Sequence, residues 1–92
     1  MKFIAESDTP FVIPIGGFLT ENRKISPITI GVVPSGSVEI MIQITNGGNW
    51  YPICDGLLKG YIAEPTADAL IAPVTALKFL PSGGDCIVEV MQ

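Results

Sequence analysis

Histidine is missing from this 92-residue sequence, and only 15% of its residues are charged. Without histidine, the Ser-His-Asp and Cys-His catalytic arrangements and the ordinary histidine-based metal sites cannot be built. A glycine-rich loop closing on Gly-Lys-Ser or Gly-Lys-Thr is missing as well, and so is a Rossmann-type glycine pattern after a strand. The sequence therefore predicts a protein that is not an enzyme and has no catalytic residues, no metal and no cofactor.

Positive charge is also scarce. Five basic residues stand against nine acidic ones, for a net charge of −4. Arg23 and Lys24 are the one adjacent pair among the basic residues, whereas a phosphate-binding face needs clustered cations. The charge pattern therefore argues against nucleic acid and against an anionic membrane surface as partners.

The acidic residues are scattered along the chain, at Glu6, Asp8, Glu21, Glu39, Asp55, Glu64, Asp68, Asp85 and Glu89. Paired carboxylates could in principle serve a glycosidase, and three loop aspartates could line a calcium site. The dense acidic spacing of a calcium loop is not present, however. Since acidic side chains are mostly solvated, we interpret them as surface residues.

Long hydrophobic runs are lacking. The longest apolar stretch, Phe11 to Leu19, is broken by Pro14, Gly16 and Gly17 and falls short of the ~20 residues of a spanning helix. Glu6 and Asp8 interrupt the region where a secretory signal would need an apolar core. We expect neither a membrane segment nor a signal peptide.

Two cysteines, Cys54 and Cys86, lie too far apart for the close C-x-x-C pairs of zinc and redox sites. A disulfide between them would depend on strand neighbours that the sequence does not show. Because no export signal is present, we expect two reduced thiols that pack as small hydrophobic residues and form no covalent bond.

Glycine and proline punctuate the whole chain and leave little room for a long helix, so many short strands are expected. The clearest strand is Val38 to Thr45, where apolar and polar residues alternate. Its register predicts a core side made by Val38, Ile40, Ile42 and Ile44, with Glu39 and Gln43 exposed on the other side. The turn residues 46–49 then predict a hairpin to a returning strand from Trp50 to Cys54.

The same alternation predicts a final strand, Cys86 to Met91, with Cys86, Val88 and Val90 on one side. It follows a loop from Pro81 to Asp85, and Val74 to Leu80 is its expected antiparallel partner, with Leu77 and Phe79 facing inward. Weaker strands are expected at Phe11–Ile15, Ile28–Val33 and Leu58–Ile62. Between Thr66 and Leu80 the alanines also allow a single helical turn that Pro73 would end.

About seven short strands in a chain of this size indicate an all-β fold. We expect one domain over residues 1–92, a small antiparallel β-sandwich of jelly-roll or immunoglobulin-like type, with a small barrel as the other arrangement. Composition adds a second expectation. Hydrophobic residues make up 48% of the chain, while ordinary domains carry about 25% charged residues and small ones have limited cores. A homo-oligomer, a trimer or a dimer, would cover the extra apolar surface.

Aromatic residues outside the core are the natural contact points for a partner. Trp50 and Tyr51 are adjacent, so strand alternation places them on opposite sides, and Trp50 is interpreted mainly as a hairpin-pairing residue. Met41 lies on the outer side of the best strand. The predicted interaction surface therefore comprises Met41, Trp50, Tyr51 and Tyr61.

The second part of the chain resembles a loosely defined group of short bacteriophage structural proteins. The matching features are the strand Val38–Thr45, the turn and Trp strand Asn46–Ile53, an Ala-Pro followed by a Leu-x-Phe strand (Ala72–Phe79), the loop Ser82-Gly83-Gly84 and the final strand from Cys86 to Val90. They cover Pro34 to the C-terminus, roughly two-thirds of the chain. Lys78 stands where members of the group commonly have arginine.

The resemblance implies a small β-sandwich that attaches to a virion in several copies, as a head decoration or a tail-associated component, after assembly in the host cytoplasm. The expected function is thus that of a non-enzymatic virion protein acting by self-association and attachment to larger virion proteins. The alternative from the residues themselves is a monomeric module that binds a carbohydrate or a receptor through Tyr51 and its neighbours.

Overall fold

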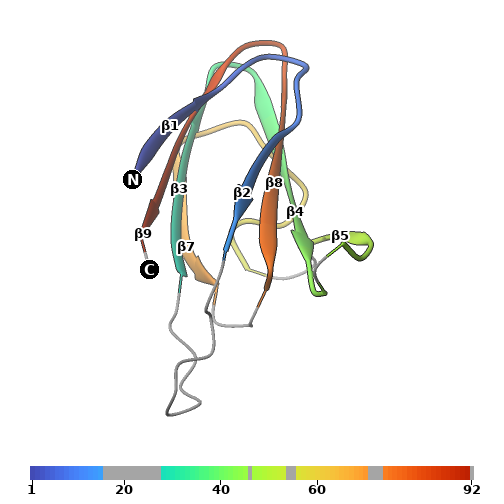
Figure 1. The fold of residues 1–92 in the computed structure, drawn as a ribbon. Helices are drawn as coiled ribbons and strands as arrows, with labels where there is room; N and C mark the ends of the chain where they lie inside the picture. The colour runs from blue at the N-terminus through green and yellow to red at the C-terminus, as the bar shows by residue number, and fades with distance from the viewer. Residues whose placement is uncertain (16–27, 46, 54–55, 71–73, 92) are drawn as a thin grey trace.

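A computed structural model describes residues 1–15, 28–45, 47–53, 56–70 and 74–91. Within these residues the chain forms nine strands and no helix, so the all-β prediction is confirmed (Figure 1). The strands are β1 (Lys2–Ala5), β2 (Phe11–Pro14), β3 (Ile28–Pro34), β4 (Ser37–Gln43), β5 (Trp50–Pro52), β6 (Tyr61–Ile62), β7 (Thr66–Leu70), β8 (Ala76–Ser82) and β9 (Cys86–Met91).

The strands make two antiparallel sheets that pack face to face as a β-sandwich (Figure 1). Sheet A has the order β1-β9-β3-β7, and sheet B has the order β2-β8-β4-β5, with β6 also paired to β4. The pairs β1·β9, β2·β8, β3·β7 and β4·β5/β6 are nested within one another along the chain. Nested pairs of this kind form one long antiparallel ribbon. Here the ribbon is wrapped so that β9 also pairs with β3, and β8 also pairs with β4. The sandwich therefore has jelly-roll topology rather than the immunoglobulin-like one.

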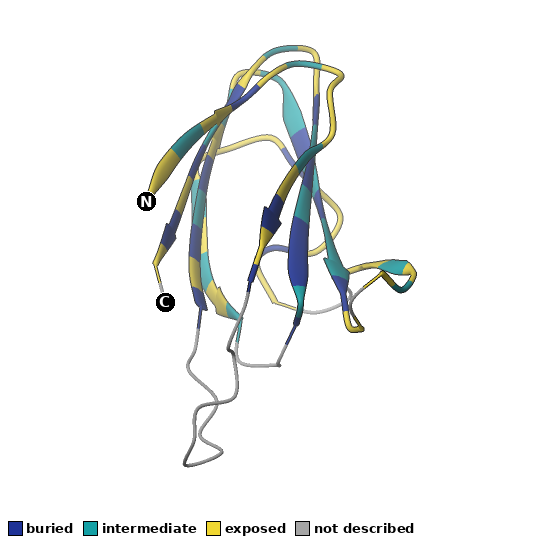
Figure 2. Ribbon diagram, in the orientation of Figure 1, coloured by how far each residue is buried: buried dark blue, intermediate teal, exposed yellow. Residues whose placement is uncertain are grey.

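The core lies between the two sheets and is made by alternate residues of each strand. Phe79 and Leu77 of β8 are fully buried, as predicted, and so are Val88 of β9 and Ile30 of β3. Along one open side, where β1 and β2 lie, Phe3 and Phe11 pack with ring centroids 5.4 Å apart. Figure 2 shows buried positions alternating with intermediate and exposed ones along the strands of both sheets.

Strand β4 follows the predicted alternation only in its first part. Val38 and Ile40 are buried as expected, but Gln43 is buried and Ile44 is 54% exposed, so the prediction was wrong for both. Burial of Gln43 is tolerated because its amide oxygen and nitrogen both have hydrogen-bond partners. Its Nε2 donates to the carbonyl of Gly48 (3.0 Å), and its Oε1 accepts from the Thr75 hydroxyl (3.2 Å). The strand ends at this residue, and Ile44 falls in the bend that follows.

Two further details of β4 differ from expectation. Glu39 is half-buried rather than exposed, and Ile42 is half-buried at the margin of the core. The hairpin to β5 is confirmed, with Ile42 opposite Tyr51 and Gln43 opposite Trp50.

The predicted pairing of the last two long strands is wrong. Strand β8 lies in sheet B and β9 in sheet A, so the connection between them crosses from one sheet to the other. Gly83 and Gly84 make this crossing with φ of 75° and 151°, conformations that favour glycine. The crossing is held by Ser35, whose N–H donates to the carbonyl of Asp85 (2.9 Å). Turn residues alone do not distinguish such a crossing from a hairpin.

The helical turn considered after Thr66 is not formed, because Thr66–Leu70 is strand β7 and pairs with β3. The alanines are individually good helix formers, but pairing to a central strand outweighs so short a local preference. Strand β1 was not predicted at all. It pairs with β9, and the terminal ammonium of Met1 donates to the carbonyl of Val90 (2.7 Å).

Cys86 is a buried free thiol, as expected of a small core residue, and burial raises its pKa. Cys54 lies outside the described residues. Within the described residues, no helix is long and apolar enough to cross a membrane.

Candidate functional site

The outer face of sheet A is unusually apolar for a sheet surface in contact with solvent. Strand alternation and the observed registers place these residues on it: Lys2, Ile4, Thr29, Gly31, Val33, Ala67, Ala69, Ile87, Glu89 and Met91. Only Lys2, Thr29 and Glu89 among them carry polar side chains. An antiparallel sheet that faces water on one side normally alternates hydrophobic-in with polar-out. We call this surface the A face.

Four of the nine large hydrophobic side chains that are exposed in the described ranges lie here. Met1 (76% exposed), Ile4 (65%), Val33 (43%) and Met91 (72%) lie on the A face or at its border. Contiguous exposed apolar surface of this kind marks an interaction site more often than scattered single residues do.

The A face is hollowed along one side. A groove of about 700 Å³ is bounded by Met1, Lys2, Glu89 and Met91 on the side of β1 and β9. On the side of β3 and β7 it is lined by Gly31, Thr29 and Ala67, together with Val33, Pro65 and Thr66. Apart from Val33, the outward residues are longer on β1 and β9 than on β3 and β7.

Gly31 lies in the middle of β3 without a backbone reason to be glycine. Its φ is not among the positive values found in this chain. A Cβ placed on it would lie 3.9 Å from the Cβ of Ala67 and 4.0 Å from that of Glu89, which are ordinary contact distances. A glycine inside a strand weakens it and often marks close approach of a ligand or another backbone. The hollow is therefore not required by the fold itself.

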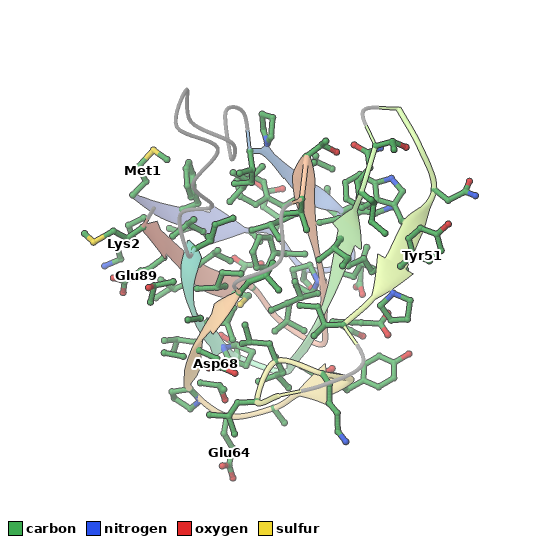
Figure 3. All side chains as sticks on the ribbon, turned by 90° about the horizontal axis from the view of Figure 1, so that it is seen from below. Met1, Lys2, Tyr51, Glu64, Asp68 and Glu89 are labelled. Carbon is green, nitrogen blue, oxygen red and sulfur yellow. The ribbon has the colours of Figure 1, made fainter. Side chains whose placement is uncertain are left out.

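The two charges of the A face lie side by side. Lys2 of β1 is directly opposite Glu89 of β9 in the antiparallel register. Figure 3 shows both side chains projecting from the same side of the molecule, close to Met1 and far from Tyr51. The A face therefore presents one positive and one negative group amid apolar surface.

Part of the outer face of sheet B is covered by side chains of the same sheet. The Lys78 ammonium lies 4.5 Å from the ring centroid of Trp50, a cation–π contact. Gln43 and Ala76 are buried although strand alternation puts them on this outer side, next to Trp50 and Pro14 in register. Trp50 therefore covers part of its own sheet, which agrees with its interpretation as a hairpin-pairing residue.

The predicted interaction residues are not all brought together. Met41, Trp50 and Tyr61 share the outer side of sheet B by register, while Tyr51 is on the opposite side of β5. Trp50 is half-buried and Tyr51 is 46% exposed. That these residues form an interaction surface stays a prediction.

Tyr61 is 77% exposed and lines a second, smaller groove of about 330 Å³. The same groove is lined by Asp8, Glu39 and Leu80. A predicted aromatic residue thus adjoins carboxylates in a hollow on sheet B.

The A face was not predicted from the sequence, although signals for it were present. Ile87 and Met91 fall on the outward side of the last strand, where polar residues are expected, and Gly31 interrupts an otherwise β-branched strand. Their convergence depends on β1 and β7 joining the sheet, and neither strand was predicted.

Across the described ranges, no group of three or more His, Cys, Asp or Glu residues is placed to hold a metal ion. Comparison of the chain with protein-family models, with curated proteins and with solved structures found no match.

Proposed function

We propose that the chain is a non-enzymatic structural protein of a phage virion, acting by self-association and by attachment to a larger capsid or tail protein. The observation that carries the proposal is the A face, which exposes Ile4, Val33, Met91 and Met1 on one side of a small sandwich. A domain of this size has little core to spare, so an uncovered apolar sheet face favours a protein that is completed by a partner.

Two further observations support the virion part of the proposal. The sequence features from Pro34 onward resemble those of short phage structural proteins. Jelly-roll topology is one of the architectures used by viral capsid domains, although lectins and cupins use it too. Because fold does not fix function, the attachment site and the host particle are to be established by experiment.

Self-association is tested by light scattering coupled to size-exclusion chromatography over a tenfold dilution. A mass that rises above one 9.8 kDa chain with concentration is expected. A single-chain mass at every concentration would contradict it. Attachment is tested by purifying particles of a phage that encodes the chain on a density gradient. The chain should be found in the particle fraction by mass spectrometry, and its absence there would contradict a structural role.

A second candidate function is favoured by the smaller groove on sheet B. Tyr61, Glu39 and Asp8 together offer an aromatic ring for stacking and carboxylates for hydroxyl groups, which suits a carbohydrate. On this hypothesis the protein is a monomeric binding module, and Tyr61→Ala should abolish glycan binding measured by titration calorimetry. Wild-type protein that binds no glycan across a panel would remove the candidate.

A further inference from the structure

We propose that the A face binds the A face of a second copy of this chain, about a two-fold axis that runs parallel to the strands between β9 and β3. The inference rests on the proposed self-association and names the surface and symmetry that produce it. A two-fold interface uses the same patch on both subunits, so the patch must complement itself.

The first argument is shape. In the observed register one row across the sheet reads Lys2, Glu89, Gly31, Ala67 from β1 to β7. Turning a second copy about the stated axis reverses this row, so that Glu89 lies over Gly31 of the other copy and Lys2 over Ala67. The next row places Met91 over Thr29 in the same way. In these two rows the longer side chains of each copy thus lie over the smaller residues of the other, and in the third row Ile87 lies over Val33 as an apolar contact.

The second argument is Gly31. Its own fold leaves room for a side chain, with the nearest atoms 3.9 Å and 4.0 Å from a built Cβ. The missing side chain costs strand stability, and a side chain of the second copy lying on this position supplies a reason for it. An apolar groove that merely faced water would gain from a β-branched residue here.

The third argument is charge. The chain carries a net charge of −4, so two copies repel each other over most orientations. Lys2 and Glu89 lie directly opposite one another on the A face, and the terminal ammonium of Met1 lies at its border, so that face has no excess of negative charge. Two copies can therefore approach through it without the repulsion that unpaired acids would produce.

Edge-to-edge pairing of sheet A is disfavoured at its β7 end. The Asp68 carboxylate accepts from the N–H of Ala69 (2.8 Å) and from the N–H of Leu57 (3.1 Å). A strand added beside β7 would have to displace these bonds, and edge strands are commonly protected in this manner. The face, rather than this edge, is the open surface of sheet A.

The size of the A face sets the strength of the pairing. Four strands about 4.8 Å apart and about five residues long at ~3.3 Å each project roughly 300 Å² per copy. Both copies together contribute at least roughly 600 Å², against the ~1,200 Å² of a small specific interface. The dimer is accordingly weak and concentration-dependent, and neighbouring copies fixed on a larger shell would strengthen it through effective concentration.

The proposal is tested by sedimentation equilibrium of the full chain over a hundredfold range of concentration, with four variants beside the wild type. Gly31→Val fills the hollow. It should raise Tm by a few degrees, because a β-branched residue replaces a mid-strand glycine, and weaken association roughly tenfold or more. A merely stabilising or destabilising substitution would not combine these two effects.

The register is tested by charge. Ala67→Lys places a lysine under Lys2 of the other copy and should weaken association roughly tenfold or more through like-charge contact. The double variant Lys2→Glu with Ala67→Lys should restore most of it. Ile44→Lys is the matched control, because it adds the same charge at a 54% exposed position outside sheet A, and it should associate like the wild type.

The outcomes separate this inference from the proposed function. A wild-type chain that stays monomeric throughout would overturn both self-association and the pairing. A chain that associates unchanged in Gly31→Val and Ala67→Lys would overturn the A-face pairing and leave self-association in place. A limiting mass of three chains would likewise overturn the two-fold arrangement alone.

Discussion

The two outer faces of this sandwich come from strands of similar composition, yet they treat their surface differently. On sheet B, Trp50 is held under the Lys78 ammonium and Gln43 is buried beside it. On sheet A, Ile4 and Met91 project into solvent, and Met91 and Gly31 line the same groove. Part of the outer face of sheet B is thus covered by its own Trp50, although Tyr61 is 77% exposed on it, whereas the A face exposes Ile4 and Met91.

The comparison shows that the tryptophan, the residue most often sought at contact surfaces, need not lie on the more open apolar face. The only tryptophan of the chain is occupied by its own hairpin, whereas the open surface is marked by small residues and by aliphatic side chains at positions where polar ones are expected. Four substitutions, the first two compared as a pair, test this contrast in order of decreasing expected effect.

The largest change in the free energy of unfolding is expected when a buried isoleucine is compared with an exposed one. Ile40→Ala, at a position 1% exposed in the core, should lower the free energy of unfolding by about 2–5 kcal/mol. Ile4→Ala, at a position 65% exposed on the A face, should change it by less than about 0.5 kcal/mol in the monomer. Urea denaturation of dilute protein measures both. Equal losses would mean that the A face is part of the fold rather than a surface awaiting a partner.

The second prediction concerns the stability that the buried Gln43 amide gives to sheet B. Gln43→Ala leaves the Gly48 carbonyl and the Thr75 hydroxyl without this partner and should cost about 1–3 kcal/mol. Thermal denaturation followed by circular dichroism provides the measurement, with Thr45→Ala at an exposed neighbouring position as control. No loss of Tm would show that the buried amide does not hold the β4–β5 hairpin.

The smallest effect is expected at the cation–π contact. Lys78→Gln removes the ammonium 4.5 Å from the Trp50 ring and should cost about 0.5–1 kcal/mol. Because Trp50 is the only tryptophan, its emission spectrum should also shift as the ring loses its cover. The exposed Lys59 provides the matched control as Lys59→Gln. An unchanged emission spectrum for Lys78→Gln would show that Trp50 is not covered from this side.

Much of the fold could be predicted from the sequence, because period-2 alternation is a local signal. It located the strands that became β4 and β9 and the inward side of β8 at Leu77 and Phe79, while glycine and proline breaks and turn residues indicated β2, β3 and the β4–β5 hairpin. It failed where the determining contact is distant. Gln43 is buried through partners in another loop, and the glycines at 83 and 84 send the chain to the other sheet rather than back along its own.

The candidate site was harder to predict for the same reason. The A face brings the first residues of the chain, strand β3, strand β7 and the last strand into one surface, and no local pattern encodes that convergence. The aromatic residues chosen from the sequence are divided between two sides of β5 and two ends of sheet B. The sequence did contain two local signals of the A face. Ile87 and Met91 occupy outward positions where polar residues are expected, and a glycine interrupts a β-branched strand.

The most direct test of self-association through the A face is a concentration series of two-dimensional ¹H–¹⁵N NMR spectra, because a weak dimer changes its population with protomer concentration. Between dilute and concentrated samples, the amide signals of Gly31, Ala67 and Glu89 should shift together along one binding curve, while those of Met41, Trp50 and Tyr61 stay in place. Shifts confined to the outer side of sheet B, with the A face unchanged, would contradict the account.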